Sequence, residues 1–260
     1  MTTDNESDAR LVSALARGIS ILNCFTPTAQ ELSSRELIER TGLAKPTLFR
    51  LLDTLCELGL LRYSERLSKY IPGVGMLNLA APALARMTVR QLARPLMQEL
   101  ADYLGGQVQL MLGYGNALTY VEIAQGLGSR LYRPEVGTHV SMSRTSSGRA
   151  YLLMMTESER AAYLDQFKAV DPQREALLRE RLADAARDLE EHGFCRGHRD
   201  LHREVEGISV PMRIRRDNEA WLFSAALPVF SEQSKRMIED VGPRLVSLVR
   251  NVEGSLGVAG

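Results

Sequence analysis

Residues 32–61, LSSRELIERTGLAKPTLFRLLDTLCELGLL, constrain the fold more than any other part of the chain. They contain two amphipathic helical patterns with only a short break between them. Ser33 and Glu36 have the spacing of a capping box, which predicts the start of the first helix. Gly42 suits the left-handed residue that ends a helix, and Pro46 suits the first turn of the next. The stretch therefore predicts two short helices joined by a tight turn.

The flanking sequence extends this pair of helices to a larger motif. A preceding helix is predicted to begin at Ser13, as its N-cap, and to end before Pro27, with Leu15, Ile19 and Leu22 on one face. After the pair, the segments LLRYS and SKYIPG predict two short strands around the turn SERL. Three helices followed by a hairpin are typical of a winged helix-turn-helix domain.

The second helix of the pair has an apolar and a polar side. Its buried stripe is expected to consist of Leu48, Leu51, Leu52, Leu55 and Leu58. In a helix-turn-helix domain the first turn of this helix enters the major groove of DNA. Arg50 lies off the stripe, and its guanidinium can pair with guanine O6 and N7. The polar side thus predicts recognition of double-stranded DNA.

The residues expected to contact DNA lie on both helices of the pair and on the hairpin. They are Ser34, Arg35, Lys45, Thr47, Phe49, Arg50, Arg62, Arg66 and Lys69. Between positions 40 and 70 six basic residues stand against three acidic ones. The charges alone also fit an ordinary solvated surface, so the DNA-binding prediction depends on the helix and turn signals. One such module makes few contacts, which predicts a dimer that reads two half-sites.

The rest of the chain predicts a second, larger domain. Residues 1–12 are expected to be a disordered tail, 13–75 the winged helix-turn-helix domain, and 76–94 a linker and dimerisation helix broken by Pro82 and bounded by Pro95. Residues 95–260 alternate strand and helix patterns, which predicts an α/β domain with a mostly antiparallel sheet. A single last helix is expected at about 232–253. The overall class is α+β.

Composition limits the functional classes. The net charge is zero, which excludes a protein that is basic over its whole surface. No apolar run approaches the ~18 residues of a membrane span, so no membrane partner is expected. Three cysteines without CxxC spacing indicate reduced thiols and a cytoplasmic location.

The stretch SRTSSGRAYLLMM, from Ser143, indicates where a small molecule would bind. Small polar residues precede an apolar helix, so main-chain N–H groups of Ser146 and Ser147 are expected to face a cavity. A helix N-terminus with free N–H groups attracts a carboxylate or phosphate. The alternative is that these serines only cap the helix. Arg133, Arg144 and Arg149 flank the stretch, and Arg149 is expected to make a structural ion pair.

Other chemistries receive little support. TSSGRA lacks the first glycine of a GxSxG nucleophile elbow, and no glycine-rich phosphate loop is present. No catalytic residue and no cofactor are therefore expected. His192, His198 and His202 leave a zinc site as an alternative, although the glycines among them argue against one continuous helix. A DNA-binding architectural protein without a ligand is a further alternative.

Four segments together resemble one family of proteins. ALARGISILNCF, the helix pair, GTHVSMSRTSSGRAYL and GISVPM…SAALPV are similar, in order and spacing, to the isocitrate-lyase-regulator (IclR) family of bacterial transcription factors. The resemblance covers about Ser13 to Arg250. It implies a DNA-binding winged helix, a linker helix, and an effector domain related to GAF domains. It also implies dimers or dimers of dimers, regulation of catabolic genes, often repression, and small carboxylate effectors.

The resemblance also implies particular effector-binding positions. They are Ser146, Ser147, His198 or its neighbour Gly197, Gly207, Ser224 and Ala226. The family often has an acidic residue near 197–198, a polar side chain at 207 and a hydroxyl at 226, and this chain departs from all three. The site is therefore expected to be less acidic and roomier, which suits a larger organic acid.

Overall fold

The computed structural model describes residues 11–168, 170–197, 199, 201–216 and 219–257. The expected tail at 1–12 therefore falls almost entirely outside the described residues. The chain divides into two compact units, Met1–Arg86 and Met87–Gly260. Each unit has its own hydrophobic core, and each is described by itself below. No helix in the described ranges is long and apolar enough to cross a membrane.

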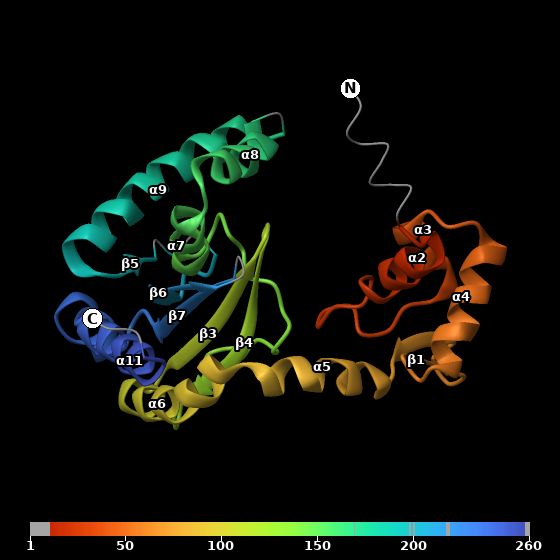
Figure 1. Ribbon diagram of the computed structural model, residues 1–260, viewed down its shortest axis with the longest axis horizontal. Helices are drawn as coiled ribbons and strands as arrows, with labels where there is room; N and C mark the ends of the chain where they lie inside the picture. The colour runs from red at the N-terminus through yellow and green to blue at the C-terminus, as the bar shows by residue number, and fades with distance from the viewer. Residues whose placement is uncertain (1–10, 169, 198, 200, 217–218, 258–260) are drawn as a thin grey trace. The chain divides into compact units, whose positions relative to one another are not determined.

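The first unit has the predicted order of elements. It consists of α2 (Ser13–Leu22), α3 (Ser34–Thr41), α4 (Lys45–Glu57), the strands β1 (Leu61–Ser64) and β2 (Lys69–Pro72), and α5 (Gly75–Arg86). β1 and β2 pair antiparallel and form the wing (Figure 1). Leu32 adds a single bridge to Tyr70 of β2, which ties the start of α3 to the wing.

The predicted turn between α3 and α4 is confirmed. The Ser33 hydroxyl accepts from the Glu36 N–H, while the Glu36 carboxylate accepts from the Ser33 N–H at 2.8 Å, which is a complete capping box. Gly42 is left-handed at φ 67°, and Pro46 lies in the first turn of α4. α4 buries Leu48, Leu52 and Leu55.

Some expectations about buried faces were wrong. Leu58 is 63% exposed, because α4 ends at Glu57 and Leu58 lies at its C-cap. α2 begins after an N-cap at Val12 and buries Gly18, Ile21 and Leu22, so Leu15 and Ile19 stay exposed. The apolar face predicted from periodicity is thus rotated relative to the face that packs on α4.

The expected linker helix at 76–94 was also wrong in its limits. α5 continues through Pro82 to Arg86, and α6 (Thr88–Leu104) contains Pro95 in its interior. A proline inside a helix costs ~3 kcal/mol. α6 offsets this by burying Ala93, Met97 and four other apolar side chains against the sheet. α5 has no buried residue, so burial within this unit does not offset the cost of Pro82 in its interior.

The second unit is built on one five-stranded antiparallel sheet, in the order β4-β3-β7-β6-β5. Its strands are β3 (Gln107–Tyr114), β4 (Ala117–Gln125), β5 (Cys195–Arg196), β6 (Val205–Arg216) and β7 (Glu219–Pro228). β3 pairs with β7 although more than a hundred residues separate them, so the central strands come from both ends of the unit. The two predicted hairpins are both present, and the expected turn at 217–218 lies outside the described residues.

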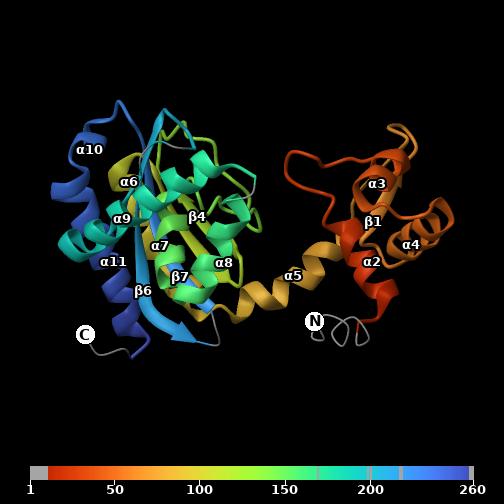
Figure 2. The same cartoon turned by 90° about the horizontal axis from the view of Figure 1, so that it is seen from above.

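Helices cover both faces of this sheet (Figure 2). One face carries α6 and α11 (Gly242–Ser255), and the other carries α7 (Ser146–Met154), α8 (Glu157–Lys168) and α9 (Pro172–His192). Because of this, β3 is buried on both sides along Gln107–Met111 rather than half-buried as its alternation predicts. The fold confirms the predicted α+β class, with a helix-turn-helix domain followed by an antiparallel-sheet domain.

The last predicted helix, 232–253, is interrupted. It consists of α10 (Glu232–Lys235), a π-helical turn η1 (Met237–Val241) and α11. The junction at Gly242 lies against the ring of Phe194, where an added Cβ would come within 2.2 Å of a ring carbon. Close packing against Phe194 therefore requires a glycine at the place where the helix changes its winding.

Candidate functional site

The start of α4 presents an open polar surface in the first unit. Lys45 and Arg50 are exposed, and Thr47 and Phe49 are half-buried. The Lys45 ammonium lies 6.0 Å from the centre of the Phe49 ring, at the edge of cation–π range. No side chain in the described ranges pairs with the Arg50 guanidinium. The surface is thus available to a partner.

The remaining residues predicted to contact DNA lie on α3 and on the wing. Ser34 is in the first turn of α3, and Arg35 pairs with Glu39 at 3.0 Å on the solvent side. Arg62 is on β1 and Arg66 is in the wing turn, and both are exposed. Lys69 lies 3.9 Å from Glu31. All nine predicted residues therefore belong to α3, α4 or the wing.

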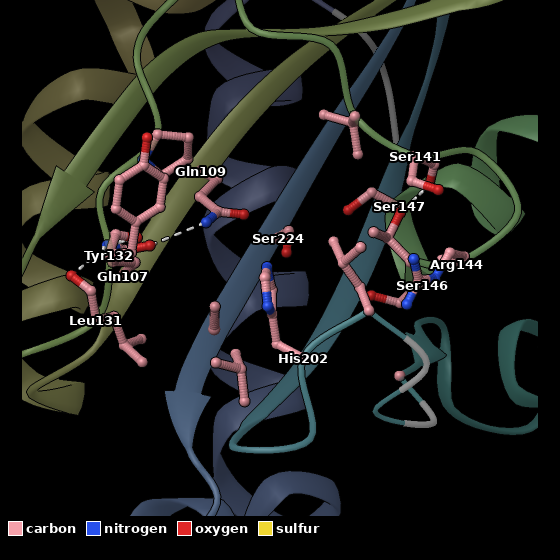
Figure 3. Close-up of a pocket in the computed structure, with 18 of the residues that line it drawn as sticks. Gln107, Gln109, Leu131, Tyr132, Ser141, Arg144, Ser146, Ser147, His202 and Ser224 are labelled. Carbon is pink, nitrogen blue, oxygen red and sulfur yellow. Dashed lines mark hydrogen bonds between the residues drawn. The ribbon is translucent and has the colours of Figure 1, made fainter. Parts of the chain in front are cut away.

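The second unit contains a pocket of about 480 Å³ between the sheet, the start of α7 and two loops (Figure 3). The sequence-predicted positions Ser146, Ser147, Gly207, Ser224 and Ala226 all line it. Gly197 lines it as well, whereas His198 lies outside the described residues. The pocket thus brings together predicted positions that are up to 80 residues apart in the chain, from Ser146 to Ala226.

A cluster of hydroxyls organises the α7 end of the pocket. Thr145 is the N-cap of α7, and its hydroxyl accepts from the Gly148 N–H at 2.9 Å. Capping therefore does not depend on Ser146 or Ser147. Their hydroxyls lie 2.9 and 2.7 Å from that of the fully buried Ser209 on β6. Their main-chain N–H groups have no acceptor in the described ranges.

Gly148 allows this arrangement because α7 approaches the preceding loop closely. A Cβ at position 148 would lie 2.2 Å from the Met142 Cα and 2.4 Å from its carbonyl oxygen. Both are main-chain atoms, so they cannot move aside as a flexible side chain would.

We expect Gly148→Ala to destabilise the second unit by about 1–3 kcal/mol or more, through overpacking. Thermal unfolding should show a fall in Tm of about 2–12 °C, given ~2–4 °C per kcal/mol for a unit of this size. Gly254→Ala is the matched control, because nothing lies within 4 Å of its added Cβ in α11. The control should hold or raise Tm, since alanine favours a helix. An equal Tm for both variants contradicts the close approach.

The sheet supplies two cross-strand rows to the floor of the pocket, and one of them is polar throughout. Cross-strand register aligns Gln109 of β3 with Ser224 of β7, and Ser224 with Ser209 of β6. The neighbouring row contains Gln107, Ala226 and Gly207. Sequence reasoning missed Gln107, Gln109 and Ser209. The available signal was a polar residue inside an apolar strand pattern, and only the register shows which of these share one face.

The pocket has an excess of positive charge. Three arginines, Arg130, Arg144 and Arg199, stand against the single carboxylate of Glu204 among its lining residues. Arg199 also pairs with Glu206 at 3.1 Å. Burial raises the pKa of Tyr120, another lining residue, to about 12, so its phenol stays neutral at ordinary pH. These groups favour an anion over a cation.

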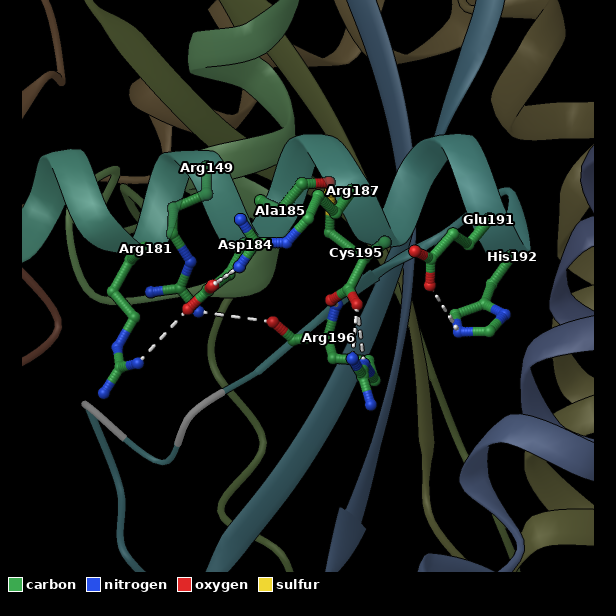
Figure 4. A network of polar contacts seen from close by, with 10 residues as sticks. Arg149, Arg181, Asp184, Ala185, Arg187, Glu191, His192, Cys195 and Arg196 are labelled. Atoms are coloured by element: carbon green, nitrogen blue, oxygen red, sulfur yellow. Dashed lines mark hydrogen bonds and ion pairs between the residues drawn. The ribbon is translucent and has the colours of Figure 1, made fainter.

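Two other predicted arginines, Arg149 and Arg133, are not among the residues that line the pocket. Arg149 is fully buried and donates to the main-chain carbonyl of Arg196 at 3.4 Å (Figure 4). Arg133 donates to the carbonyl of Ile123 at 2.9 Å. Nearby, buried Asp188 of α9 binds Arg196 through Nε at 2.8 Å, which anchors β5 beside the pocket. These arginines have structural contacts.

The three histidines considered for a zinc site do not form one described cluster, because His192 and His202 lie in different surroundings and His198 is outside the described residues. His192 ends α9 and stacks on Phe194 at 5.6 Å between ring centres, whereas His202 lines the pocket. Among the described residues no group of three His, Cys, Asp or Glu side chains is arranged to hold a metal ion.

The fold and the pocket define a helix-turn-helix protein that carries a separate, pocket-bearing domain. Comparison with known proteins gives its family. The model of the IclR helix-turn-helix domain matches residues 14–65, and that of the bacterial transcriptional regulator IclR C-terminal domain matches residues 81–252. The chain belongs to the IclR family of bacterial transcriptional regulators.

Individual relatives match over nearly the whole chain. The HTH-type transcriptional regulator TsaQ1/TsaQ2 of Comamonas testosteroni is 28% identical over 98% of this chain and 92% of its own. An IclR-family regulator from Brucella abortus has a crystal structure with a TM-score of 0.84 and 34% identity, over 98% and 97% of the two chains.

A third solved structure contains a ligand. The IclR homolog from Microbacterium hydrocarbonoxydans, complexed with 4-hydroxybenzoate, has a TM-score of 0.74 at 21% identity, over 95% of this chain and 100% of its own. At that identity the likeness shows a shared fold.

Proposed function

We propose that the protein represses a catabolic operon by binding its operator, and that a small organic acid in the pocket controls this binding. The observation that carries the effector part is the pair of main-chain N–H groups of Ser146 and Ser147 at the start of α7. Both serines line a pocket with three arginines and one carboxylate. Such a helix start favours a carboxylate. In this proposal the protein has no catalytic activity.

The proposed DNA contacts are assigned to the exposed and half-buried polar side chains of α4, α3 and the wing. Arg50 contacts a guanine edge in the major groove, and Thr47 contacts a phosphate or a thymine methyl. Lys45, Arg35 and Ser34 contact phosphates at the entrance to the groove, and the wing residues Arg62, Arg66 and Lys69 follow the backbone. Arg35 and Lys69 exchange their present carboxylate partners for phosphate oxygens.

The effector is an organic anion larger than a two-carbon acid. A volume of about 480 Å³ falls in the range of pockets for small ligands. Gly207 contributes to the volume of the pocket because it has no side chain there. An added Cβ would be in ordinary contact with the Ser146 hydroxyl, at 3.8 Å. The relative that holds 4-hydroxybenzoate supports an aromatic acid. Leu131, Val140 and Tyr120 supply apolar surface for such a ring.

Assembly into a homodimer, or a dimer of dimers, accounts for the exposed apolar surface of the first unit. Leu15 is 67% exposed and Leu77 and Leu79 are each 68% exposed, although all three are leucines on helices. α5, with no buried residue, acts as the linker helix of the dimer. Effector binding that changes the arrangement of two linkers needs a coupling of only ~1–3 kcal/mol to alter operator occupancy several-fold or more.

Two measurements on the intact protein test this function. A thermal-shift screen of organic acids should give a Tm rise of about 5–10 °C for an effector at a hundred times its Kd. A gel-shift titration with DNA from upstream of the gene and its neighbours should show specific binding that the same acid changes. Specific DNA binding with no response to any acid favours a ligand-independent architectural protein. If the protein shows neither a thermal shift with any acid nor specific DNA binding, the proposal is overturned.

A further inference from the structure

The surrounding contacts determine the orientation of the Gln109 amide in the floor of the pocket. Gln109 is only 7% exposed and lines the pocket from β3. Its Nε2 donates to the Gln107 Oε1 at 3.0 Å. Its Oε1 receives no hydrogen bond from the residues that the structure describes. Figure 3 shows the Gln109 oxygen directed away from Gln107 and toward the side where Ser224 lies.

A chain of donors and acceptors sets this orientation. The main-chain carbonyl of Tyr132 has only acceptor capacity, so the Gln107 group 3.1 Å from it must be the amide nitrogen. The carbonyl of Leu131, at 3.5 Å, imposes the same requirement. The Gln107 oxygen then faces Gln109 and needs a donor, which is the Gln109 nitrogen. The Gln109 oxygen is consequently the atom left for the pocket.

A buried acceptor of fixed orientation discriminates between ligand groups. A hydroxyl or amino group that donates to this oxygen forms a hydrogen bond in a site mostly shielded from water. An ether oxygen or a bare ring carbon leaves the Gln109 oxygen without a donor, and an ether also brings two lone-pair atoms together. Ser224 does not impose this selectivity, because its hydroxyl can rotate to donate or accept.

The acceptor lies at the opposite end of the pocket from the helix start. Gln109, Ser224 and Ser209 occupy one cross-strand row, so Gln109 and Ser209 are two strand spacings, ~9.5 Å, apart along the sheet. Ser209 in turn holds the hydroxyls of Ser146 and Ser147. In Figure 3 Ser224 lies between Gln109 and these two serines. A ligand that reaches both ends therefore carries its two polar groups several bonds apart.

We propose that this pocket selects an organic anion with a hydroxyl or amino donor at the end remote from its carboxylate, with the Gln109 Oε1 as the acceptor of that donor. Gln107 is the positioning residue, since it acts on the ligand through Gln109. The proposal rests on the proposed function of the pocket and adds the residue that determines specificity. The proposal thus specifies the chemical class of the ligand and the protein atom that recognises it.

Isothermal titration of the full-length protein with four rigid probes tests the selectivity. The probes are benzoate, 4-hydroxybenzoate, 4-aminobenzoate and 4-methoxybenzoate. We expect the hydroxy and amino acids to bind about tenfold more tightly than benzoate and the methoxy acid, as one net hydrogen bond in a shielded site would give. This ranking is measured on the wild-type protein and so does not depend on how a variant folds.

Variants then assign the effect to the acceptor. Gln109→Met keeps the length of the side chain and removes the acceptor, so all four probes should bind with nearly equal affinity. Gln107→Met releases the Gln109 amide to turn, and the preference for donors over the methoxy acid should shrink. Gln98→Met is the control, because the Gln98 amide donates to the carbonyl of Gln125 and does not line the pocket. It should keep the full wild-type ranking.

The outcomes separate the two proposals. Equal affinity of the wild type for all four probes overturns the acceptor role while an anion-binding pocket stands. Tightest binding of the methoxy acid shows that the amide presents its N–H groups, and this also overturns it. If none of the four probes binds, both the selectivity and the aromatic-acid effector fail.

Discussion

Arg50→Ala should abolish the preference of the protein for its operator over unrelated DNA. A bidentate arginine–guanine contact supplies ~1–3 kcal/mol of discrimination, and a dimer loses it in both half-sites. The affinity for operator should therefore fall about 30-fold or more. Arg50 is exposed, and no described side chain pairs with it, so the fold should remain intact. Competition gel shifts with operator and scrambled DNA measure the change.

A wing residue provides the comparison for Arg50. Arg66 is exposed in the wing turn, where the proposed partner is a phosphate. Arg66→Ala should weaken binding to operator and scrambled DNA by similar factors and reduce the salt dependence by about two units of slope, one for each half-site of the dimer. If Arg50→Ala behaves in this same uniform way, Arg50 is a backbone contact and α4 reads bases through other side chains. Size-exclusion chromatography should show unchanged assembly for both variants.

Ser146→Trp should remove the response to effector and leave operator binding unchanged. The indole would fill the α7 end of the pocket and cover the N–H groups that are proposed to hold a carboxylate. Binding of an effector should fall below detection in titration calorimetry, which is a loss of at least a hundredfold. The gel shift should then be the same with and without the acid. A wild-type titration curve for this variant would remove the effector site from this pocket.

Two further variants separate loss of the site from loss of the fold. Ser158→Trp puts the same residue on the exposed start of α8, and it should respond to effector as the wild type does. Gly207→Val is a smaller intrusion, because an added Cβ at 207 has only the Ala225 carbonyl at 3.4 Å and the Ser146 hydroxyl at 3.8 Å nearby. It should weaken effector binding in part with little change in Tm. If Tm falls for Ser146→Trp but not for Ser158→Trp or Gly207→Val, the loss of effector binding is due to overpacking of the fold.

The helix pair was predictable because its signals are local. A capping box needs only residues three positions apart, and Gly42 needs only its own backbone angles. The helical and strand segments of the second domain were found in the same way, from periods of 3.6 and 2. The prolines show the limit of such rules: Pro95 lies inside α6, because burial against the sheet outweighs the lost main-chain hydrogen bond.

Faces of helices were harder to predict than the helices themselves. Leu15 and Ile19 fit an apolar stripe as well as Ile21 does, yet only Ile21 is buried in the described unit. The sequence shows that a stripe is apolar, but the partner that covers it depends on packing elsewhere in the chain or in another copy. Leu58 was assigned to the buried stripe for the same reason and lies exposed at the end of α4.

The pocket illustrates what the sequence by itself determined and what only the tertiary structure decided. Ser146 and Ser147 could be identified at the start of a helix from their neighbours alone. Gln109, Ser224 and Ser209 could not be connected, because they lie on three strands and become one row only through the register of β3, β7 and β6. Register arises from the whole sheet and the helices packed on it, since a shift of one residue would turn each side chain to the opposite face. Features that depend on neighbouring residues, such as the start of α7, can thus be predicted from the sequence. The shape and polarity of the pocket depend on how distant strands align, which only the tertiary structure shows.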